Sequence, residues 1–295
     1  TLTTHGLVKK QNRKLELKLR AVEMLWSCLP ASKYPTNEFD EMWKKLLINQ
    51  FHDIIPGSSI NLVYQTTHKE YEQIHEGCNT LINKVASILF EEDENSFVLV
   101  NTLSYNWKGV INIPDSFEGY SLIDDNKQVL QLQQTEDRVF ASIELEPLSF
   151  TTIKKGDRVF LDKKKDKDLL LENDLIRYEF DSSGLLISIY DKEIKKEFLK
   201  EPGNVLSLYE DRPNNWDAWD VDFFYRDALI ETATIKKVEL LSKGDVVDQI
   251  KLKFSIGRST IEQVASLGSH SKRIDFITDV EWNEKHKMLR VHFPV

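Results

Sequence analysis

The sequence predicts a multidomain α+β protein in which a bundle of three helices precedes two antiparallel β-domains. Two observations predict this order. Apolar residues recur at helical spacing over residues 7–90, whereas a period of two prevails from residue 95 onward. In addition, the chain has 295 residues, 41% of them hydrophobic and 29% charged, which is the composition of a soluble globular protein with room for two or three cores.

The first two helices are predicted from their apolar stripes. Residues 15–26 place apolar side chains on one face, and this helix is expected to end before Pro30. Residues 39–51 repeat the pattern more regularly, with apolar positions at i, i+3, i+4, i+7 and i+8. Thr36 or Asn37 is the expected N-cap of this second helix because its side-chain oxygen can accept a bond from a free backbone N–H group.

The third helix is predicted to start near Ser58 or Ser59, either of which is a good cap, and to carry its stripe over residues 64–88. Three helices with short connections bury such stripes against one another. The sequence therefore predicts a three-helix bundle over residues 1–92.

Short strands are predicted beyond the acidic spacer at residues 91–94. Four alternating runs with turn signals between them predict a small β-domain over residues 93–160: FVLVNTL, KGVINIP, VFASIEL and SFTTIKK. Further strands are predicted from residue 169 onward, two of them joined by a hairpin turn at residues 181–184, and their spacing is typical of a β-sandwich. We expect residues 161–295 to be the start of a large sandwich domain that the chain contains only in part.

Charge and cysteine content narrow the classes of function. A net charge of −9 argues against nucleic acid, whose binding needs clustered cations. No apolar run approaches the ~20 residues of a membrane helix. Cys28 and Cys78 are the only cysteines, so a disulfide framework is not expected. Thr1 in place of an initiator Met, together with a last strand that looks unfinished, predicts an internal piece of a larger enzyme.

The segment NQFHDIIPGSSI, residues 49–60, predicts a metal and sugar site. It sets His52 beside Asp53 where the second helix is expected to run into Pro56 and Gly57, so that both side chains point away from the core. A neutral imidazole is a common zinc ligand, but catalytic zinc takes three protein ligands, so the others must come from elsewhere. The structural alternatives are a histidine that stabilises a helix C-terminus and an acid that orients the imidazole.

A second cluster predicts a carbohydrate-binding loop. Trp216, Asp217, Trp219 and Asp220 follow a segment rich in Asn and Pro. Aromatic faces pack against sugar C–H groups while carboxylates accept hydrogen bonds from hydroxyls, and loops on a rigid scaffold commonly carry such residues. The alternative is a hydrophobic plug between the sandwich and the bundle.

The histidine segment resembles the zinc-histidine segment of glycoside hydrolase family 38, the α-mannosidases. Five more segments are similar to this family in the same order: TLTT with VKKQNRKLE (1–16), VNTLS (100–104), LENDLIRYEFDSSGLLISIYDKE (171–193), LYEDRPNNWDAWDVDFFY (208–225) and SKRIDFITDVEWNEKHKMLRVHFPV (271–295). One departure is Thr102, where proline is commoner in the family. The resemblance implies a large sandwich of galactose-mutarotase type.

The resemblance also implies a zinc (Zn2+) cofactor and a role for each candidate residue. His52 would be one of four zinc ligands, with a His and two Asp on a preceding barrel domain, and one of those Asp would be the nucleophile. Asp53 would reach the hydroxyls of the bound mannose. The substrate would be a mannose-containing oligosaccharide, which Trp216, Asp217, Trp219 and Asp220 are predicted to contact from their residue types. No catalytic residue is expected in this chain, because the nucleophile and the acid/base belong to the N-terminal catalytic barrel. The isolated chain is therefore expected to be inactive.

Two further expectations concern the class of protein. The parent would be a retaining enzyme that hydrolyses terminal α-mannosides of glycans, and Phe51 before His52, together with WDAWD, resembles its cytosolic and bacterial branch, which implies a cytoplasmic location without a membrane or nucleic-acid partner. The alternative is a noncatalytic carbohydrate-binding or scaffolding module built on the sandwich. What precedes Thr1 in the gene product distinguishes the two.

Overall fold

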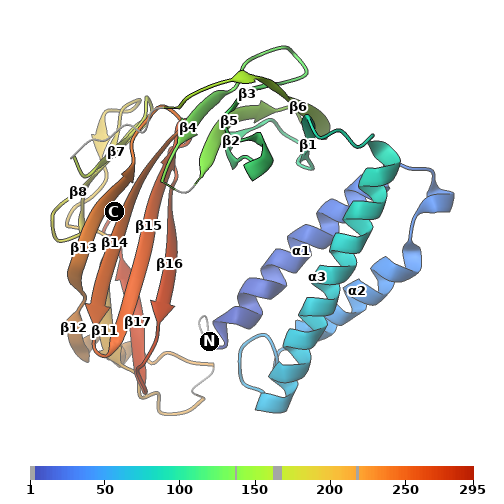
Figure 1. Cartoon of the computed structure of the whole chain (residues 1–295). Helices are drawn as coiled ribbons and strands as arrows, with labels where there is room; N and C mark the ends of the chain where they lie inside the picture. The colour runs from blue at the N-terminus through green and yellow to red at the C-terminus, as the bar shows by residue number, and fades with distance from the viewer. Residues whose placement is uncertain (1–3, 137, 162–167, 217–218) are drawn as a thin grey trace. The chain divides into compact units, whose positions relative to one another are not determined.

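The computed structural model describes residues 4–136, 138–161, 168–216 and 219–295 (Figure 1). These residues form two compact units. The first comprises Thr1–Asp93 with Pro213–Asp222, and the second comprises Glu94–Arg212 with Phe223–Val295. Helices build the first unit, and antiparallel strands build the second.

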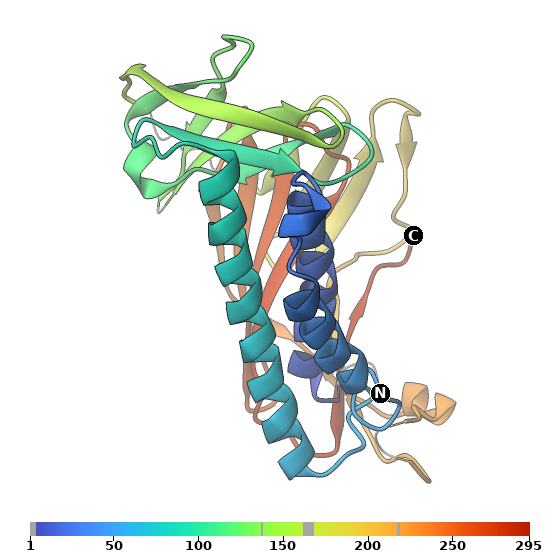
Figure 2. The same ribbon diagram turned by 90° about the vertical axis from the view of Figure 1, so that its right-hand side faces the viewer.

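The first unit is a bundle of three helices that lie side by side (Figure 1, Figure 2). They are α1 (Gly6–Trp26), α2 (Thr36–Asn49) and α3 (Asn61–Leu89), with a 3-10 turn at Ala31–Lys33. The predicted stripes meet in one core, whose buried members include Leu15, Leu19, Val22, Trp26, Phe39, Leu46, Tyr71, Ile74, Cys78 and Leu81. Trp26 also donates a hydrogen bond from Nε1 to the Leu81 carbonyl at 3.2 Å, so the indole is both packed and hydrogen-bonded.

The helix ends differ from the predicted ones. Pro35 and Ile60 precede α2 and α3, and neither helix has a side-chain cap, so the predicted caps at Thr36 or Asn37 and at Ser58 or Ser59 are wrong. α2 ends at Asn49, well before Pro56, because the Gln50 N–H turns back to the Leu47 carbonyl in a tighter i→i+3 bond.

The predicted stripe of α2 is correct at Phe39, Met42 and Leu46, which are buried. Leu47 and Phe51, assigned to the same stripe, are instead 56% and 53% exposed. Phe51 leaves the stripe because the helix has already ended at Asn49.

Two three-stranded antiparallel sheets open the second unit, in the orders β1-β6-β3 and β2-β5-β4. The strands are β1 (Ser96–Asn101), β2 (Trp107–Asn112), β3 (Tyr120–Ile123), β4 (Gln131–Gln134), β5 (Val139–Leu145) and β6 (Ser149–Arg158). A core that includes Ile113, Phe117, Leu122, Ala141 and Ile153 lies among them. The four runs predicted as strands correspond to β1, β2, β5 and β6.

Three more antiparallel sheets complete the second unit, in the orders β10-β9-β8-β7, β12-β11-β17 and β13-β14-β15-β16. The strands are β7 (Leu170–Glu172), β8 (Ile176–Phe180), β9 (Leu186–Asp191), β10 (Lys196–Glu197), β11 (Val205–Glu210), β12 (Leu229–Thr232), β13 (Thr234–Ser242), β14 (Val247–Ile256), β15 (Ser259–Gly268), β16 (Ile274–Glu281) and β17 (Lys287–His292). They share one core with buried members on β7, β8, β11, β14 and β15, as in sheets packed face to face. The predicted helical bundle followed by antiparallel sandwich sheets is confirmed.

Two details of the sandwich are not evident from the sequence pattern. β16 and β17 follow each other within residues 271–295 but belong to different sheets, because β16 pairs with β15 and β17 pairs with β11. β15 itself has no clear hydrophobic alternation because its inward positions include Ser259 and Gln263. The Gln263 amide is satisfied by Asn204, just before β11, and by Thr278 of β16.

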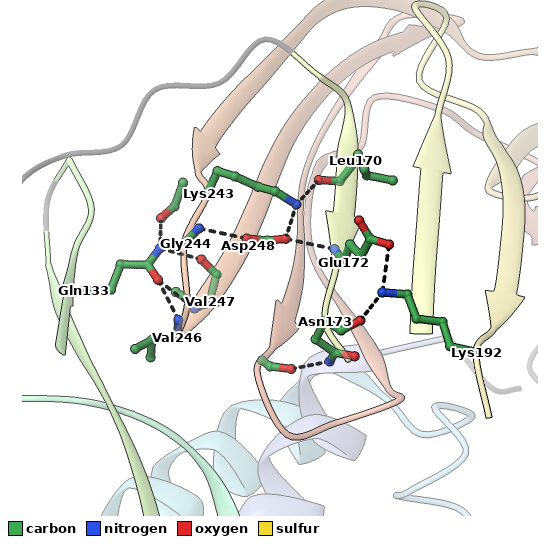
Figure 3. Close-up of polar contacts among 12 residues, drawn as sticks. Gln133, Leu170, Glu172, Asn173, Lys192, Lys243, Gly244, Val246, Val247 and Asp248 are labelled. Carbon is green, nitrogen blue, oxygen red and sulfur yellow. Dashed lines mark hydrogen bonds and ion pairs between the residues drawn. The ribbon is translucent and has the colours of Figure 1, made fainter. Parts of the chain in front are cut away.

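A polar junction joins β4 to the turn between β13 and β14 (Figure 3). The buried Gln133 amide donates to Ser242 Oγ and the Val247 carbonyl, both at 2.6 Å, and accepts the N–H groups of Val246 and Val247 at 2.8 and 3.0 Å. Gly244 leaves room for it, since a Cβ there would lie 2.5 Å from Gln133 Oε1. One glutamine thus satisfies four groups of the turn.

Asp248 continues this junction toward β7. It is 2% exposed, forms an ion pair with Lys243 at 2.6 Å, and accepts the N–H groups of Glu172 and Gly244 at 2.8 and 3.0 Å (Figure 3). A buried carboxylate is tolerated when its oxygens are satisfied in this way.

Acid is expected to destabilise the second unit. Hydrogen bonds from Lys253 and Lys251 lower the pKa of Glu262 to about 2 from 4.5, and a hydrogen bond from Lys272 lowers the pKa of Asp191. A lowered folded-state pKa contributes stability above the unfolded value that is lost as the pH falls through the folded value. The midpoint of urea unfolding should therefore drop as the pH falls from 4.5 to about 2.

Lysine variants check the origin of that pH dependence. Lys272→Met removes the lysine partner of Asp191 and should reduce the loss of stability in acid, while the part due to Glu262 remains. Lys236→Met, at an exposed lysine of β13, should leave the pH dependence of stability unchanged. If the unmodified chain and both lysine variants lost stability equally as the pH falls, the Lys272–Asp191 ion pair would not contribute to the pH dependence.

The two cysteines of the chain do not pair with each other. Cys28 is exposed and Cys78 is buried, and both are free thiols, as expected. Burial raises the pKa of Cys78 to about 11, so this thiol is inert at neutral pH. None of the helices in the described residues combines the length and apolar character that a bilayer crossing requires.

Candidate functional site

His52 lies in the connection between α2 and α3, three residues after the helix ends, and not within the helix terminus. The Phe51 carbonyl accepts the N–H groups of Ile54 and Ile55 and so starts a tight turn. Gly57 then takes φ 99°, and a Cβ there would lie 2.7 Å from Thr4 Cγ2. The chain reverses here because only glycine fits both the backbone conformation and the space.

The His52 and Asp53 side chains are both open to solvent, at 70% and 54% exposure. His52 Nε2 lies 3.6 Å from Asp53 Oδ2, and the ring centroids of Phe51 and His52 are 4.2 Å apart. These are an ion-pair contact and a ring contact of the imidazole with its two neighbours in the sequence. The pair is therefore presented outward at one end of the bundle and does not serve its core.

The donors present suit one position of a metal site and no more. An exposed imidazole is a normal zinc ligand, and an adjacent carboxylate is a normal partner for it. In the part of the chain that the structure describes, no three His, Cys, Asp or Glu side chains gather to hold a metal ion. The predicted zinc role of His52 and sugar role of Asp53 stay predictions, and they need ligands from another polypeptide region.

Exposed apolar side chains surround this pair along the chain. Five residues of the α2 end and the α3 start, here called the apolar rim, are between 53% and 67% exposed: Leu47, Ile48, Phe51, Ile60 and Leu62. Large apolar residues gathered in one exposed stretch are typical of a contact surface.

Asn49 and Gln50 are functional candidates that sequence reasoning left without a role. Asn49 is 1% exposed and donates from Nδ2 to Glu70 Oε2 at 2.6 Å and to the Lys45 carbonyl at 2.9 Å. Gln50 donates from Nε2 to Glu16 Oε1 at 2.8 Å. Their polar character next to His52 was the available signal, but their carboxylate acceptors, Glu70 and Glu16, lie on other helices, far away in the sequence.

The tryptophan loop is exposed where it is described. Trp216 is 71% exposed with φ 64°, and Trp219 is 41% exposed. The Trp216 carbonyl accepts the N–H groups of Trp219 and Asp220 at 2.7 and 3.0 Å, which closes a local turn. Asp217 lies outside the described residues. The segment Pro213–Asp222 groups with the helices in the first compact unit, and its predicted sugar contacts stay predictions.

A cavity of about 310 Å3 lies beside the polar junction of the second unit, lined in part by Glu172, Asn173, Asp248 and His270. Lys192 pairs with Glu172 at 2.8 Å (Figure 3). The Asn173 amide donates to the carbonyls of Gly268 and Ser271. His270 Nε2 lies 2.8 Å from Ser142 Oγ. Because these four side chains already have partners in the fold, we assign them to structure.

Two family models match the chain. Residues 1–89 match the alpha mannosidase middle domain, and residues 171–295 match the glycosyl hydrolases family 38 C-terminal domain. The first match contains His52 and Asp53, and the second contains the tryptophan loop.

The chain is also similar to individual α-mannosidases. The chain is 30% identical to human alpha-mannosidase 2C1 over 304 residues, which is 100% of this chain and 28% of that protein. It is 27% identical to alpha-mannosidase G of Dictyostelium discoideum, covering 98% of this chain and 31% of that protein. Among solved structures, a glycosyl hydrolase family 38 protein from Enterococcus faecalis has the same fold, with a TM-score of 0.75 at 17% identity over 99% of this chain and 45% of that one.

The chain thus spans less than a third of the length of these curated relatives. Both matched domains come from one family, and the relatives match along essentially the whole chain. The chain belongs to glycoside hydrolase family 38, with the middle domain of the α-mannosidases at its start and the family's C-terminal domain at its end.

Proposed function

We propose that this chain is the middle and C-terminal part of a longer protein, the parent, and that the parent is a zinc-dependent retaining α-mannosidase acting on terminal α-mannosides of glycans. The observation that carries the proposal is the outward-facing His52–Asp53 pair, within the segment that matches the middle-domain model. A histidine that stabilises its own helical bundle would be buried in the core or would bond to a helix terminus. His52 is instead exposed and lies three residues beyond the end of α2.

The catalytic carboxylates would come from the N-terminal part of the parent. Retaining hydrolysis uses two carboxyl groups about 5–5.5 Å apart, one as nucleophile and one as acid/base. Zinc held by His52 together with ligands from that part would supply Lewis acidity toward sugar hydroxyls. The residues of this chain would bind and orient: His52 through a ring nitrogen, and Asp53 by accepting a hydrogen bond from a mannose hydroxyl.

The tryptophan loop would supply apolar contacts to the oligosaccharide. The exposed rings of Trp216 and Trp219 can pack on sugar C–H faces, and the exposed Asp220 can accept hydroxyl bonds. Asp217 completes the proposed set on sequence grounds alone.

The apolar rim would pack against the N-terminal catalytic barrel of the parent, which would bring the missing zinc ligands next to His52. We further propose domain boundaries at residues 92/93 and 160/161, and a cytoplasmic location. The free thiols Cys28 and Cys78 agree with a reducing compartment.

Product analysis tests the proposed function. The parent, incubated with an aryl α-mannoside and followed by NMR, should release α-mannose first, since retention preserves the anomeric configuration. The isolated 295-residue chain should release none. Release of β-mannose by the parent would contradict retention, turnover by the isolated chain would contradict the placement of the catalytic groups, and an inactive parent with zinc bound would favour a noncatalytic binding module.

A further inference from the structure

We infer that Glu16 and Glu70 are positioning residues for His52, acting through Gln50 and Asn49. The inference rests on the proposed function and adds to it the groups that hold the zinc-binding side chain in place. It also gives a physical reason for the polar pair that precedes His52 in the sequence.

On the α3 side, a buried side-chain amide donates a hydrogen bond to a carboxylate. Asn49 is the last residue of α2 and is almost fully buried, and its Nδ2 group bonds both to Glu70 Oε2 and to the Lys45 carbonyl one turn earlier. The same side chain thus closes its own helix and ties it to α3. A bond from an amide to a charged acceptor is stronger than a neutral one.

On the α1 side, the next residue, Gln50, donates a hydrogen bond to a second carboxylate. Gln50 Nε2 donates to Glu16 Oε1, while Arg13 holds the other oxygen of Glu16 at 3.2 Å. Two consecutive side chains therefore connect the end of α2 to both neighbouring helices, two and three residues before His52. This fixes the direction in which the backbone enters the turn.

The chain leaving the turn is held as well. Tyr64, buried on α3, accepts the Ser59 N–H at 2.9 Å and donates to the Ile54 carbonyl at 3.2 Å. Lys9 of α1 donates from Nζ to the Pro56 carbonyl at 3.1 Å and to the Thr4 carbonyl at 2.5 Å. The backbone between residues 49 and 59 is thus secured on both sides, while the imidazole it carries remains open to solvent.

A secured backbone under an open side chain is what a metal ligand requires. A ligand that must adopt one orientation loses affinity when its support loosens, and loss of such a supporting partner typically costs about 10–100-fold in metal affinity.

Zinc affinity of the parent tests the inference, measured with zinc alone in competition with a chelator. Glu70→Ala and Glu16→Ala should each weaken zinc binding by about 10–100-fold. Glu70→Gln keeps an acceptor oxygen for Asn49 and should restore most of the affinity. The matched control is Glu72→Ala, at an exposed residue of α3, and it should change nothing.

Hydrogen exchange on the 295-residue chain supplies a readout that needs no zinc. Glu70→Ala should speed amide exchange at residues 51–59 more than in the rest of the bundle. Zinc binding that depends on His52 but not on Glu16 or Glu70 would overturn the inference and leave the proposed function standing. Zinc binding that does not depend on His52 would overturn both. Slow exchange at residues 51–59 in Glu70→Ala would also contradict the inference.

Discussion

Replacing His52 with alanine in the parent should remove bound zinc and lower kcat/KM on α-mannosides by at least about a hundredfold. Loss of an outer partner of a metal ligand already costs up to about 100-fold, and loss of the ligand itself costs more. The bundle should stay folded, because the imidazole is 70% exposed and supports no core contact. Metal content by mass spectrometry and steady-state kinetics provide the two measurements.

Two control variants separate metal binding from other roles. His68→Ala, at another histidine of the bundle, should keep both zinc and activity. Asp53→Asn should keep zinc and raise KM if Asp53 contacts the sugar, whereas it should lower zinc affinity if Asp53 only orients the imidazole. Full zinc content in the His52→Ala parent would contradict the assignment of His52 as a ligand.

Replacing Gln133 with alanine should cost the second unit about 3 kcal/mol or more in free energy of unfolding. The substitution leaves the N–H groups of Val246 and Val247 and the Val247 carbonyl without the partner they have in the junction. Each buried group left unsatisfied costs about 1–3 kcal/mol, less where water can enter. Urea unfolding of the 295-residue chain should show a clearly lower midpoint.

Gln131 offers a matched control for this variant. It lies on the same strand, β4, but is exposed, so Gln131→Ala should change stability by no more than about 0.5 kcal/mol. If the two alanine variants unfolded at the same urea concentration, the junction would not hold β4 to the β13–β14 turn in the way the hydrogen bonds indicate.

The helices were predictable because their stripes are regular, and their ends were not. Leu15, Leu19, Val22 and Trp26 recur at helical spacing and are all buried. The caps were wrong because serine and threonine near a helix start suggest a cap, whereas Pro35 and Ile60 occupy the positions just before α2 and α3. Local propensity is a weak guide when tertiary packing sets where a helix begins.

Strands with mixed inward positions were also beyond sequence reasoning. β15 lies in the middle of its sheet and pairs along its full length with β14, yet Ser259 and Gln263 interrupt its apolar face. Only the partners on other strands reveal why a buried glutamine is stable there.

The sequence was enough to predict the residues of the candidate site, but not the residues that hold their backbone in place. NQFHD pointed to His52 and Asp53 from residue type and resemblance. Glu16 and Glu70 look like ordinary charges on a solvated helix face, and they reach Gln50 and Asn49 only after the bundle forms. These hydrogen bonds join residues 21 and 34 positions apart in the sequence, so no local pattern predicts them.

Anomalous diffraction at the zinc edge, from crystals of the zinc-loaded parent, tests the central claim most directly. We predict a zinc peak about 2.0–2.1 Å from a ring nitrogen of His52, with the remaining ligands supplied from outside residues 1–295. A fully coordinated zinc elsewhere in the parent, with the His52 ring directed away from it, would contradict the account.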